Sequence, residues 1–357
     1  MKNYSLILAG GNGTRFWPLS RQISPKQVLN LSGNDAMINE TIKRINGLVD
    51  YEDTYVITNE SQRSAIENIL YSSVSRANIL TEPFGRNTAP CILYSAMHIY
   101  KEHGDAVLIV LPSDAFIKNE AVFEEVLKIA VKAAEESSDI LTVGINPTFP
   151  ATGYGYIKRG SDCADHEASK VLEFVEKPDV EHARQYLLSG QYLWNGGIFI
   201  FKLSVIIENF KRFLPRMYDL FEEAMPDFCT EREFEALKSV YDKIKPISID
   251  YGLLERSNDV SVVSGDFGWS DVGSWDMLGN VFNPDEQGNI VKANHVGIDD
   301  NDCIIYSDGD KMIATVGLNE MIIVDTSDAL LVCPKNHAQD VRKIVDKLKA
   351  DGRNELI

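Results

Sequence analysis

The sequence has few basic residues for its length and no long hydrophobic run. Lys and Arg number 35 against 53 Asp and Glu in 357 residues, which gives a formal net charge of −18. Nucleic-acid binding depends on phosphate contacts from a basic surface, so this balance argues against a nucleic-acid partner. No segment reaches the roughly 18 apolar residues of a spanning helix, and no basic amphipathic stretch indicates a membrane partner.

Cysteine and histidine are also scarce, and neither forms a recognisable pattern. The five cysteines are scattered, odd in number and without a C-x-x-C pair. The apolar stretch 4–9 is too short for the core of a signal peptide. Together these features predict reduced cysteines in a cytoplasmic protein. The six histidines show no metal-ligand spacing, so no role is assigned to them.

The composition, 44% hydrophobic and 25% charged, is that of a folded soluble protein. Short apolar runs alternate with helical patterns: runs at 4–9, 54–58, 106–111 and 140–144, and helices at 38–49, 61–70, 88–103 and 120–137. This alternation predicts an α/β fold with a Rossmann-like, mostly parallel sheet flanked by helices. Ligands of such sheets bind beyond the carboxyl ends of the strands, so functional residues are expected there.

The sequence pattern of the second half of the chain changes near residue 285. Before it lie strand-like runs at 171–175 and 197–201 and helical patterns at 205–214 and 231–241. After it, short β-type runs alternate with Asp, Asn and Gly and lead to a final helix at 338–349. The turn signal at 283–285 divides the chain into a catalytic domain, 1–283, and a small β-rich domain, 284–357. The acidic run 299–302 is interpreted as a solvated turn.

A glycine-rich turn follows the first strand. Gly10, Gly11 and Gly13 allow a tight turn whose amides can approach a phosphate. A dinucleotide-binding fingerprint needs glycine where Phe16 stands, and a P-loop needs Gly-Lys where Arg15 and Phe16 stand. The turn is therefore expected to hold phosphates in another way, although taken alone it is also compatible with a purely structural role.

The residues after this turn are more specific. The stretch 10–21, GGNGTRFWPLSR, and then Pro25-Lys26-Gln27 resemble the GGxGxRLWPLSR…PKQ signature of the mannose-1-phosphate guanylyltransferases, a family of sugar nucleotidylyltransferases. Further segments resemble family motifs in the same order over nearly the whole chain: 82–90, 111–114, 152–157, 174–178, 194–199 and 267–275. The sequence departs from the usual pattern at Phe16 (Leu), Ala115 (often His) and Gly196 (often Ser).

The resemblance implies a reaction and a metal ion. The family transfers GMP from GTP to α-D-mannose 1-phosphate and forms GDP-mannose and pyrophosphate, by in-line attack of the sugar phosphate on the α-phosphorus. Asp114 and Asp271 are expected to hold Mg²⁺, with Mn²⁺ as the alternative ion, because Mg²⁺ prefers a few carboxylates plus phosphate oxygens. Either aspartate alone is equally well explained as a loop or cap residue.

The resemblance also implies which residues form the three parts of the site. Catalysis is assigned to three cations that would stabilise phosphate charge: Arg15, Lys26 and Lys177. Nucleotide binding is assigned to Gly10, Gly11, Gly13, Thr14, Glu82, Arg86, Asn87 and Thr88. Sugar binding is assigned to Gly153, Glu176, Asn195 and Gly196.

Several of these assignments have a structural alternative. Arg86 and Asn87 are equally well explained as residues that cap and order their loop, and Asn195 as a turn residue. Trp194 and Trp269 are expected to pack rather than to stack on a ligand ring. Five cations are expected to converge on one cleft: Arg15, Arg21, Lys26, Arg86 and Lys177.

The resemblance finally implies a C-terminal β-helical domain and a homodimer. The sequence stops at Ile357, before the isomerase domain of the longer relatives, so no isomerase activity is expected. Two other functions remain open. One is the same reaction with a different sugar 1-phosphate or nucleotide, because specificity can depend on one or two contacts. The other is an inactive regulatory homologue, which the presence of all the charged site residues disfavours.

Overall fold

The computed structural model describes residues 1–357 except 12, 32–33 and 161–166. The described residues contain a nine-stranded sheet with the order β3-β2-β1-β4-β9-β6-β10-β8-β7. One half consists of parallel strands: β1 (Asn3–Leu8), β2 (Thr54–Asn59), β3 (Ile79–Glu82) and β4 (Val107–Pro112). The other half contains β6 (Ile140–Ile145), β7 (Gly155–Arg159), β8 (Ala168–Glu176), β9 (Tyr192–Lys202) and β10 (Val260–Gly265).

The predicted parallel arrangement holds for β1 to β4 and for the pair of β6 and β10. It does not hold for β8, which runs antiparallel to β10, or for β9. This strand lies between β4 and β6 and runs antiparallel to both. β7 and β8 are also antiparallel to each other. An apolar run reads the same in either direction, so the hydrophobic pattern that predicted the strand contained no information on its orientation.

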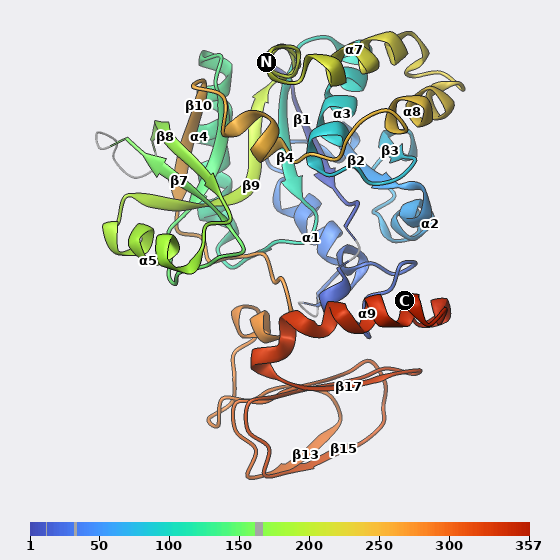
Figure 1. Ribbon diagram of the computed structural model, residues 1–357, viewed down its shortest axis with the longest axis vertical. Helices are drawn as coiled ribbons and strands as arrows, with labels where there is room; N and C mark the ends of the chain where they lie inside the picture. The colour runs from blue at the N-terminus through green and yellow to red at the C-terminus, as the bar shows by residue number, and fades with distance from the viewer. Residues whose placement is uncertain (12, 32–33, 161–166) are drawn as a thin grey trace.

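Helices cover both faces of the sheet (Figure 1). Alternate residues of a strand point to opposite faces, so Leu108 belongs to the core under α3, α6, α7 and α8, and Ile109 to the core under α1, α2 and α4. The bounds are α1 (Met37–Arg44), α2 (Glu60–Ile69), α3 (Thr88–His103), α4 (Glu120–Glu136), α5 (Val180–Ser189), α6 (Leu203–Phe213), α7 (Pro215–Ala224) and α8 (Glu233–Tyr241). The helix predicted at 38–49 is shorter than expected, because its last residues form turns.

The C-terminal region is a small stack of β-strands. Ile290, Ile304 and Ile322 are register partners in successive parallel strands, so each coil of the chain lies on the previous one. The strands are β12 (Ile290–Lys292), β13 (His295–Ile298), β14 (Ile304–Ser307), β15 (Ile313–Val316), β16 (Met321–Asp325) and β17 (Leu330–Pro334). In Figure 1 the helix α9 (Val341–Ala350) lies between this stack and the large sheet domain.

The N-terminal signature segment shares a hydrophobic core with the C-terminal region. Phe16 and Trp17 pack in one cluster with residues of β14 and β16, and the Trp17 indole donates a hydrogen bond to the Leu356 carbonyl at 2.8 Å. The Arg21 guanidinium also donates to the Leu356 carbonyl and pairs with Asp328 at 2.7 Å. The expectation that Arg21 converges on the substrate cleft is therefore wrong, because its charge is used to hold the end of the chain.

The acidic run 299–302 is only partly a solvated turn. Asp300 is 5% exposed, and its carboxylate accepts hydrogen bonds from the Leu318 amide at 2.9 Å and from the Thr315 hydroxyl. The interpretation was wrong for this residue because backbone amides at the turns of a tightly coiled chain need a buried hydrogen-bond acceptor. The other three residues of the run are exposed.

Two expectations about the whole chain can be compared with the described residues. The four described cysteines, Cys91, Cys229, Cys303 and Cys333, are free thiols, and Cys163 lies outside the described residues. None of the described helices combines the length and the apolar character that crossing a lipid bilayer requires.

Candidate active site

The glycine turn after β1 packs directly against Lys26. Gly13 has φ 57°, and a Cβ atom at this position would lie 2.4 Å from the Lys26 Cβ. A side chain is therefore excluded by both conformation and space. Lys26 itself is only 3% exposed, so an ammonium group is buried immediately behind the turn.

The Lys26 ammonium joins the two aspartates that were predicted to bind metal. Its Nζ atom donates to the Asp114 carbonyl at 3.0 Å, to Asp114 Oδ2 at 2.9 Å and to the Asp271 carbonyl at 2.7 Å. An ammonium has three N–H bonds, so these contacts use all of them. The structure thus brings Lys26, Asp114 and Asp271 together, and Lys26 acts here on the aspartates rather than as a free phosphate ligand.

The Asp271 carboxylate is oriented by a neighbouring tyrosine. The Tyr154 hydroxyl donates to Asp271 Oδ1 at 2.7 Å. Burial, followed by the Asp271 charge, raises the pKa of Tyr154, whereas the nearby Arg15 charge acts in the opposite direction. Arg15 therefore lies close enough to this cluster to influence it electrostatically.

One oxygen of each aspartate remains available for a cation. Among the described residues, Asp114 Oδ1 and Asp271 Oδ2 make no hydrogen bond or ion pair. A Cβ atom at Gly273 would lie 2.8 Å from Asp271 Oδ2, so the glycine leaves space beside that oxygen. Two carboxylate oxygens are the donor type that Mg²⁺ prefers, so the residues fit the predicted ion.

Glu82, at the end of β3, faces the glycine turn. The residue is 5% exposed, and its Oε2 lies 3.5 Å from the position of a Cβ on Gly10. The Tyr241 hydroxyl donates to Glu82 Oε1 at 2.7 Å. Burial raises the pKa of Glu82 to about 7, against the opposing effect of this hydrogen bond. A carboxyl group that is about half protonated at neutral pH therefore lies beside the predicted nucleotide turn.

The residues after Glu82 all have structural partners. Arg86 Nε donates to the Tyr241 carbonyl at 3.1 Å. Asn87 is the N-cap of α3, and its Oδ1 accepts from the Thr88 amide at 2.8 Å. Thr88 Oγ1 in turn accepts from the Ile249 amide at 2.9 Å. These contacts favour the interpretation in which Arg86 and Asn87 order the loop, and their roles as nucleotide ligands stay predictions.

The predicted sugar side contains a second carboxylate group. Glu176, at the end of β8, forms an ion pair with Lys177, whose φ of 51° is unusual for a residue with a side chain. Asn195 donates to Asp250 Oδ1 at 2.9 Å. Burial and the charge of Glu176 raise the pKa of Asp250 to about 6. A Cβ atom on Gly155 would lie 2.5 Å from Glu176 Oε2, so this glycine is required by the carboxylate.

Two other glycines were assigned to the sugar, and the structure distinguishes them. A Cβ atom on Gly196 would lie 3.0 Å from the Val143 carbonyl, so packing on β6 already explains that glycine. A Cβ atom on Gly153 would meet nothing within 4 Å among the described residues. Gly153 therefore has open space beside it, as the predicted close approach of a ligand requires.

Sequence reasoning missed three residues that organise the site. Tyr154 lay inside a quoted motif but was given no role, and its ring packs between Trp194 and Trp269, with centroid distances of 5.1 and 5.3 Å. This arrangement agrees with the expected packing role of the tryptophans. Tyr241 and Asp250 lie outside every motif, and no local pattern in the sequence marks them.

Comparison with known proteins identifies the family. The nucleotidyl transferase family model matches residues 4–288, and the model of the mannose-phosphate isomerase/GMP-like β-helix domain matches residues 293–348. A mannose-1-phosphate guanylyltransferase from Salmonella montevideo is 41% identical over 99% of this chain and 75% of its own length. One from Escherichia coli (strain K12) is 38% identical with the same coverage.

A solved structure agrees with these relatives. It is described as a mannose-1-phosphate geranyltransferase from Thermus thermophilus and superposes with a TM-score of 0.87 at 34% identity, over 98% of this chain and all of its own. The chain is thus similar over nearly its whole length to proteins that share both of its domains. The chain belongs to the mannose-1-phosphate guanylyltransferase family of nucleotidyl transferases.

Proposed function

We propose that the protein transfers GMP from GTP to α-D-mannose 1-phosphate and releases pyrophosphate. A phosphate oxygen of the sugar forms a bond to the α-phosphorus, and the bond between the α-phosphorus and the bridging oxygen breaks. Pyrophosphate leaves with the electron pair. The attacking oxygen is already anionic, so no side chain has to remove a proton, and catalysis consists of positioning and charge stabilisation.

The observation that carries this proposal is the contact of one buried ammonium with two aspartates from distant segments. Lys26 Nζ bonds to Asp114 Oδ2 and to the main-chain carbonyl of Asp271, so both residues lie against the same ammonium. Mg²⁺, or Mn²⁺ as the alternative ion, would be held by Asp114 and Asp271 and would neutralise charge on the α-phosphate. Lys26 reaches a phosphate only by releasing one of its three bonds, so its first role is to position the aspartates.

The phosphates of the two substrates are assigned to the remaining cations. The amides of the glycine turn and Arg15 would stabilise the charge that develops on the leaving pyrophosphate. Lys177 is 56% exposed in its side chain, and it lies at the sugar side, where its partner is Glu176. It would bind the incoming sugar phosphate by replacing its ion pair with Glu176 by an ion pair with that phosphate.

The base and the sugar are assigned to two different groups of residues. Glu82 lies beside Gly10 at the end of β3. When protonated, its carboxyl group has one O–H donor as well as acceptor oxygens, which suits the N–H and C=O groups on the edge of guanine. Asn195, Glu176 and Asp250 supply polar groups for the sugar hydroxyls. The choice of GTP and mannose 1-phosphate over similar substrates rests on the names of the relatives.

A substrate panel tests this choice. Pyrophosphate release should be measured with GTP, ATP, UTP and dTTP, each combined with mannose 1-phosphate or glucose 1-phosphate. We expect kcat/KM for GTP with mannose 1-phosphate to exceed that of every other pair at least tenfold. Turnover of another pair while this pair fails would reject the proposed substrates and retain the reaction type.

The metal assignment has its own variant. Asp271→Asn should lower kcat about 10²-fold or more and leave the fold intact, because one charge opposite the reacting phosphate is lost. The matched control is Asp266→Asn, the same change at an exposed residue five positions earlier. Equal activity of the two variants would remove Asp271 from the metal site.

We also propose that the protein is a cytoplasmic homodimer, as its family resemblance implies. The chain has a mass of 39.9 kDa, so light scattering coupled to gel filtration should give about twice this value. A mass of one chain at micromolar concentration would contradict the dimer. Fractionation of the producing cells should recover the activity with the cytoplasmic proteins.

A further inference from the structure

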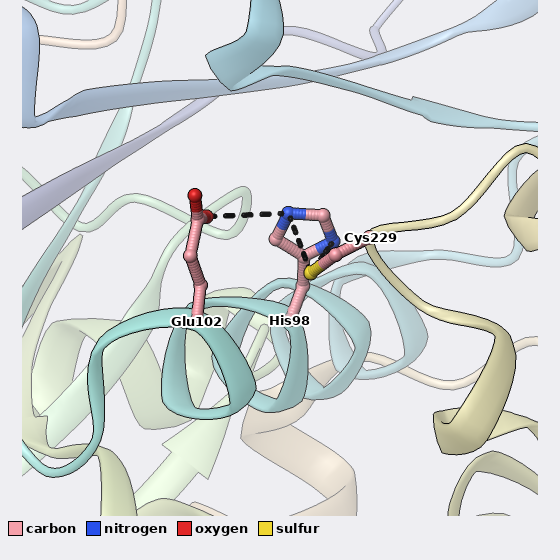
Figure 2. Close-up of side chains that lie close together, drawn as sticks. All are labelled: His98, Glu102 and Cys229. Carbon is pink, nitrogen blue, oxygen red and sulfur yellow. Dashed lines mark hydrogen bonds and ion pairs between the residues drawn. The ribbon is translucent and has the colours of Figure 1, made fainter.

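A cluster of potential metal ligands lies near the C-terminal end of α3, away from the substrate site. His98 and Glu102 are one helical turn apart on α3, and Cys229 lies in the segment before α8 (Figure 2). One ligand atom of each residue lies within 4.8 Å of the others. His98 is ten residues from Thr88, where α3 meets the nucleotide loop, a distance of about 15 Å along a helix. The cluster is therefore separate from the nucleotide loop at the other end of α3.

The distances between these atoms match a metal site. His98 Nε2 lies 3.7 Å from Cys229 Sγ and 3.8 Å from Glu102 Oε2. Metal–ligand bonds of about 2.0–2.3 Å at tetrahedral angles place neighbouring ligands about 3.4–3.6 Å apart. The separation of Nε2 from Oε2 is too long for a hydrogen bond but fits two ligands of one ion. Figure 2 shows Glu102 and Cys229 on different sides of the ring.

A further carboxylate holds the histidine in the state that binds metal. His98 Nδ1 lies 2.6 Å from Glu233 Oε1. A carboxylate only accepts hydrogen bonds, so Nδ1 carries the proton, and in the neutral ring Nε2 is left with its lone pair. A carboxylate on the second nitrogen is the usual outer partner of a histidine that binds zinc. His98 is 7% exposed, so this arrangement is buried and oriented before any ion arrives.

Hydrogen bonds also position the other two residues. The Tyr55 hydroxyl donates to Glu102 Oε2 at 2.9 Å. Lys101 holds the segment before Cys229 against α3, because its ammonium donates to the carbonyls of Met225, Pro226 and Phe228 at 2.9, 2.9 and 2.7 Å. The Cys229 amide donates to Glu233 at 3.2 Å. The chain that carries the thiol is thus fixed to the helix that carries the histidine.

We propose that His98, Glu102 and Cys229 bind Zn²⁺, with Glu233 as the positioning residue behind the histidine. A thiol and an imidazole select a soft ion such as zinc over Mg²⁺ or Ca²⁺. The thiol gives up its proton on binding. Cys229 Sγ also lies 3.9 Å from His98 Nδ1, so its side chain has to turn toward Nε2, and its exposure on the surface leaves it free to do so.

The electrostatics of the cluster favour a dication. The carboxylates of Glu102 and Glu233 lie 3.8 and 2.6 Å from the two ring nitrogens of His98. The same two carboxylates attract a divalent ion, which would compensate both them and the thiolate. The bound ion would link α3 to the start of α8, the helix whose last residue, Tyr241, bonds to Glu82.

The test uses Co²⁺ as a coloured substitute for Zn²⁺ in the metal-free full chain, with excess Mg²⁺ to occupy sites made only of carboxylates. A thiolate bound to Co²⁺ gives a strong charge-transfer band in the near ultraviolet, which oxygen and nitrogen ligands do not give. We expect this band in the wild-type protein, its loss on addition of Zn²⁺, and its absence in Cys229→Ser and His98→Gln. Cys333→Ser is the matched control and should keep the band.

Two further measurements separate the proposal from a purely structural cluster. Glu233→Gln should keep the band but weaken Zn²⁺ binding 10- to 100-fold, as expected for an outer partner of the histidine. Zn²⁺ should raise the melting temperature of the wild-type protein but not that of Cys229→Ser. Because Cys229 is exposed, this variant is expected to fold even if His98→Gln does not. A wild-type protein without the band, or a Cys229→Ser variant that retains it, would overturn the proposal.

Discussion

The buried carboxyl group of Glu82 leads to a prediction about stability and pH. Burial raises its pKa from 4.5 to about 7 in the native protein. Between these two values the native state holds the proton more tightly than the unfolded chain does. Stability therefore falls as the pH rises through this window and becomes constant above it. Glu82→Gln keeps an acceptor for the Tyr241 hydroxyl but has no proton to lose, so the variant lacks this slope.

The size of the effect follows from the interval between the two pKa values. Each pH unit is worth about 1.4 kcal/mol, so the full interval corresponds to about 3 kcal/mol as an upper limit. Unfolding entropy near the midpoint is about 2.1 cal/mol/K per residue, or about 0.7 kcal/mol/K for this chain. The melting temperature of Glu82→Gln, relative to that of the wild type, should therefore be higher at pH 8 than at pH 5, by at most about 4 °C.

Scanning calorimetry of both proteins at pH 5, 6, 7 and 8 measures this difference directly. All other titrating groups are common to the two proteins and cancel in the comparison. Glu136→Gln, the same substitution at an exposed residue at the end of α4, is the control and should lack the slope that burial produces. A difference between Glu82→Gln and wild type that is the same at pH 5 and pH 8 would refute the argument that burial governs this carboxyl group.

Three further variants test the contacts around Lys26 and the C-terminal region. Gly13→Ala places a Cβ 2.4 Å from the Lys26 Cβ on a residue with φ 57°. We expect the free energy of unfolding to fall by about 1–2 kcal/mol in calorimetry and pyrophosphate release to become much slower. Normal activity would contradict the packing of the glycine turn against Lys26. Tyr154→Phe removes the bond to Asp271 and a weak contact with the Met277 sulfur. The Mg²⁺ concentration for half-maximal activity should then rise severalfold, and an unchanged Mg²⁺ titration would reject the role of Tyr154 in orienting Asp271. Arg21→Ala should speed amide hydrogen exchange near Leu356 and leave the KM for GTP unchanged. A large rise in this KM would instead indicate that Arg21 contacts the substrate.

Elements with strong local signals were predictable from the sequence. Residues 88–103 were predicted as a helix, and α3 has the same bounds, because the Asn87 cap and Gly104 with its positive φ mark both ends. β3 was missed because its four residues, ILTE, contain only two apolar side chains and end in Thr and Glu. The orientation of β9 was not predictable, since it depends on how the chain returns across the sheet.

The site was predictable only where whole motifs identified it. Asp114 and Asp271 are 157 residues apart, and only the family resemblance predicted that they share a site. In the structure both residues contact Lys26. Tyr241 and Asp250 have no motif, and their partners, Glu82 and Asn195, lie 159 and 55 residues away. A residue whose role depends on one distant hydrogen bond leaves no pattern in its own neighbourhood. The same reason explains why His98, whose proposed partner Cys229 is 131 residues away, was given no role.

The N-terminal signature segment also shows why a motif does not reveal what each of its side chains contacts. Lys26 faces the predicted metal ligands, but Arg21, five residues earlier, holds the Leu356 carbonyl and Asp328 of the C-terminal region. Phe16 and Trp17 pack into the same C-terminal core. The β-stack therefore supports the segment that carries Lys26 and the catalytic candidate Arg15. It follows that loosening the C-terminal region should impair the catalytic step before the large sheet loses its stability, because the first structure to move would be the segment that positions Lys26 against Asp114 and Asp271.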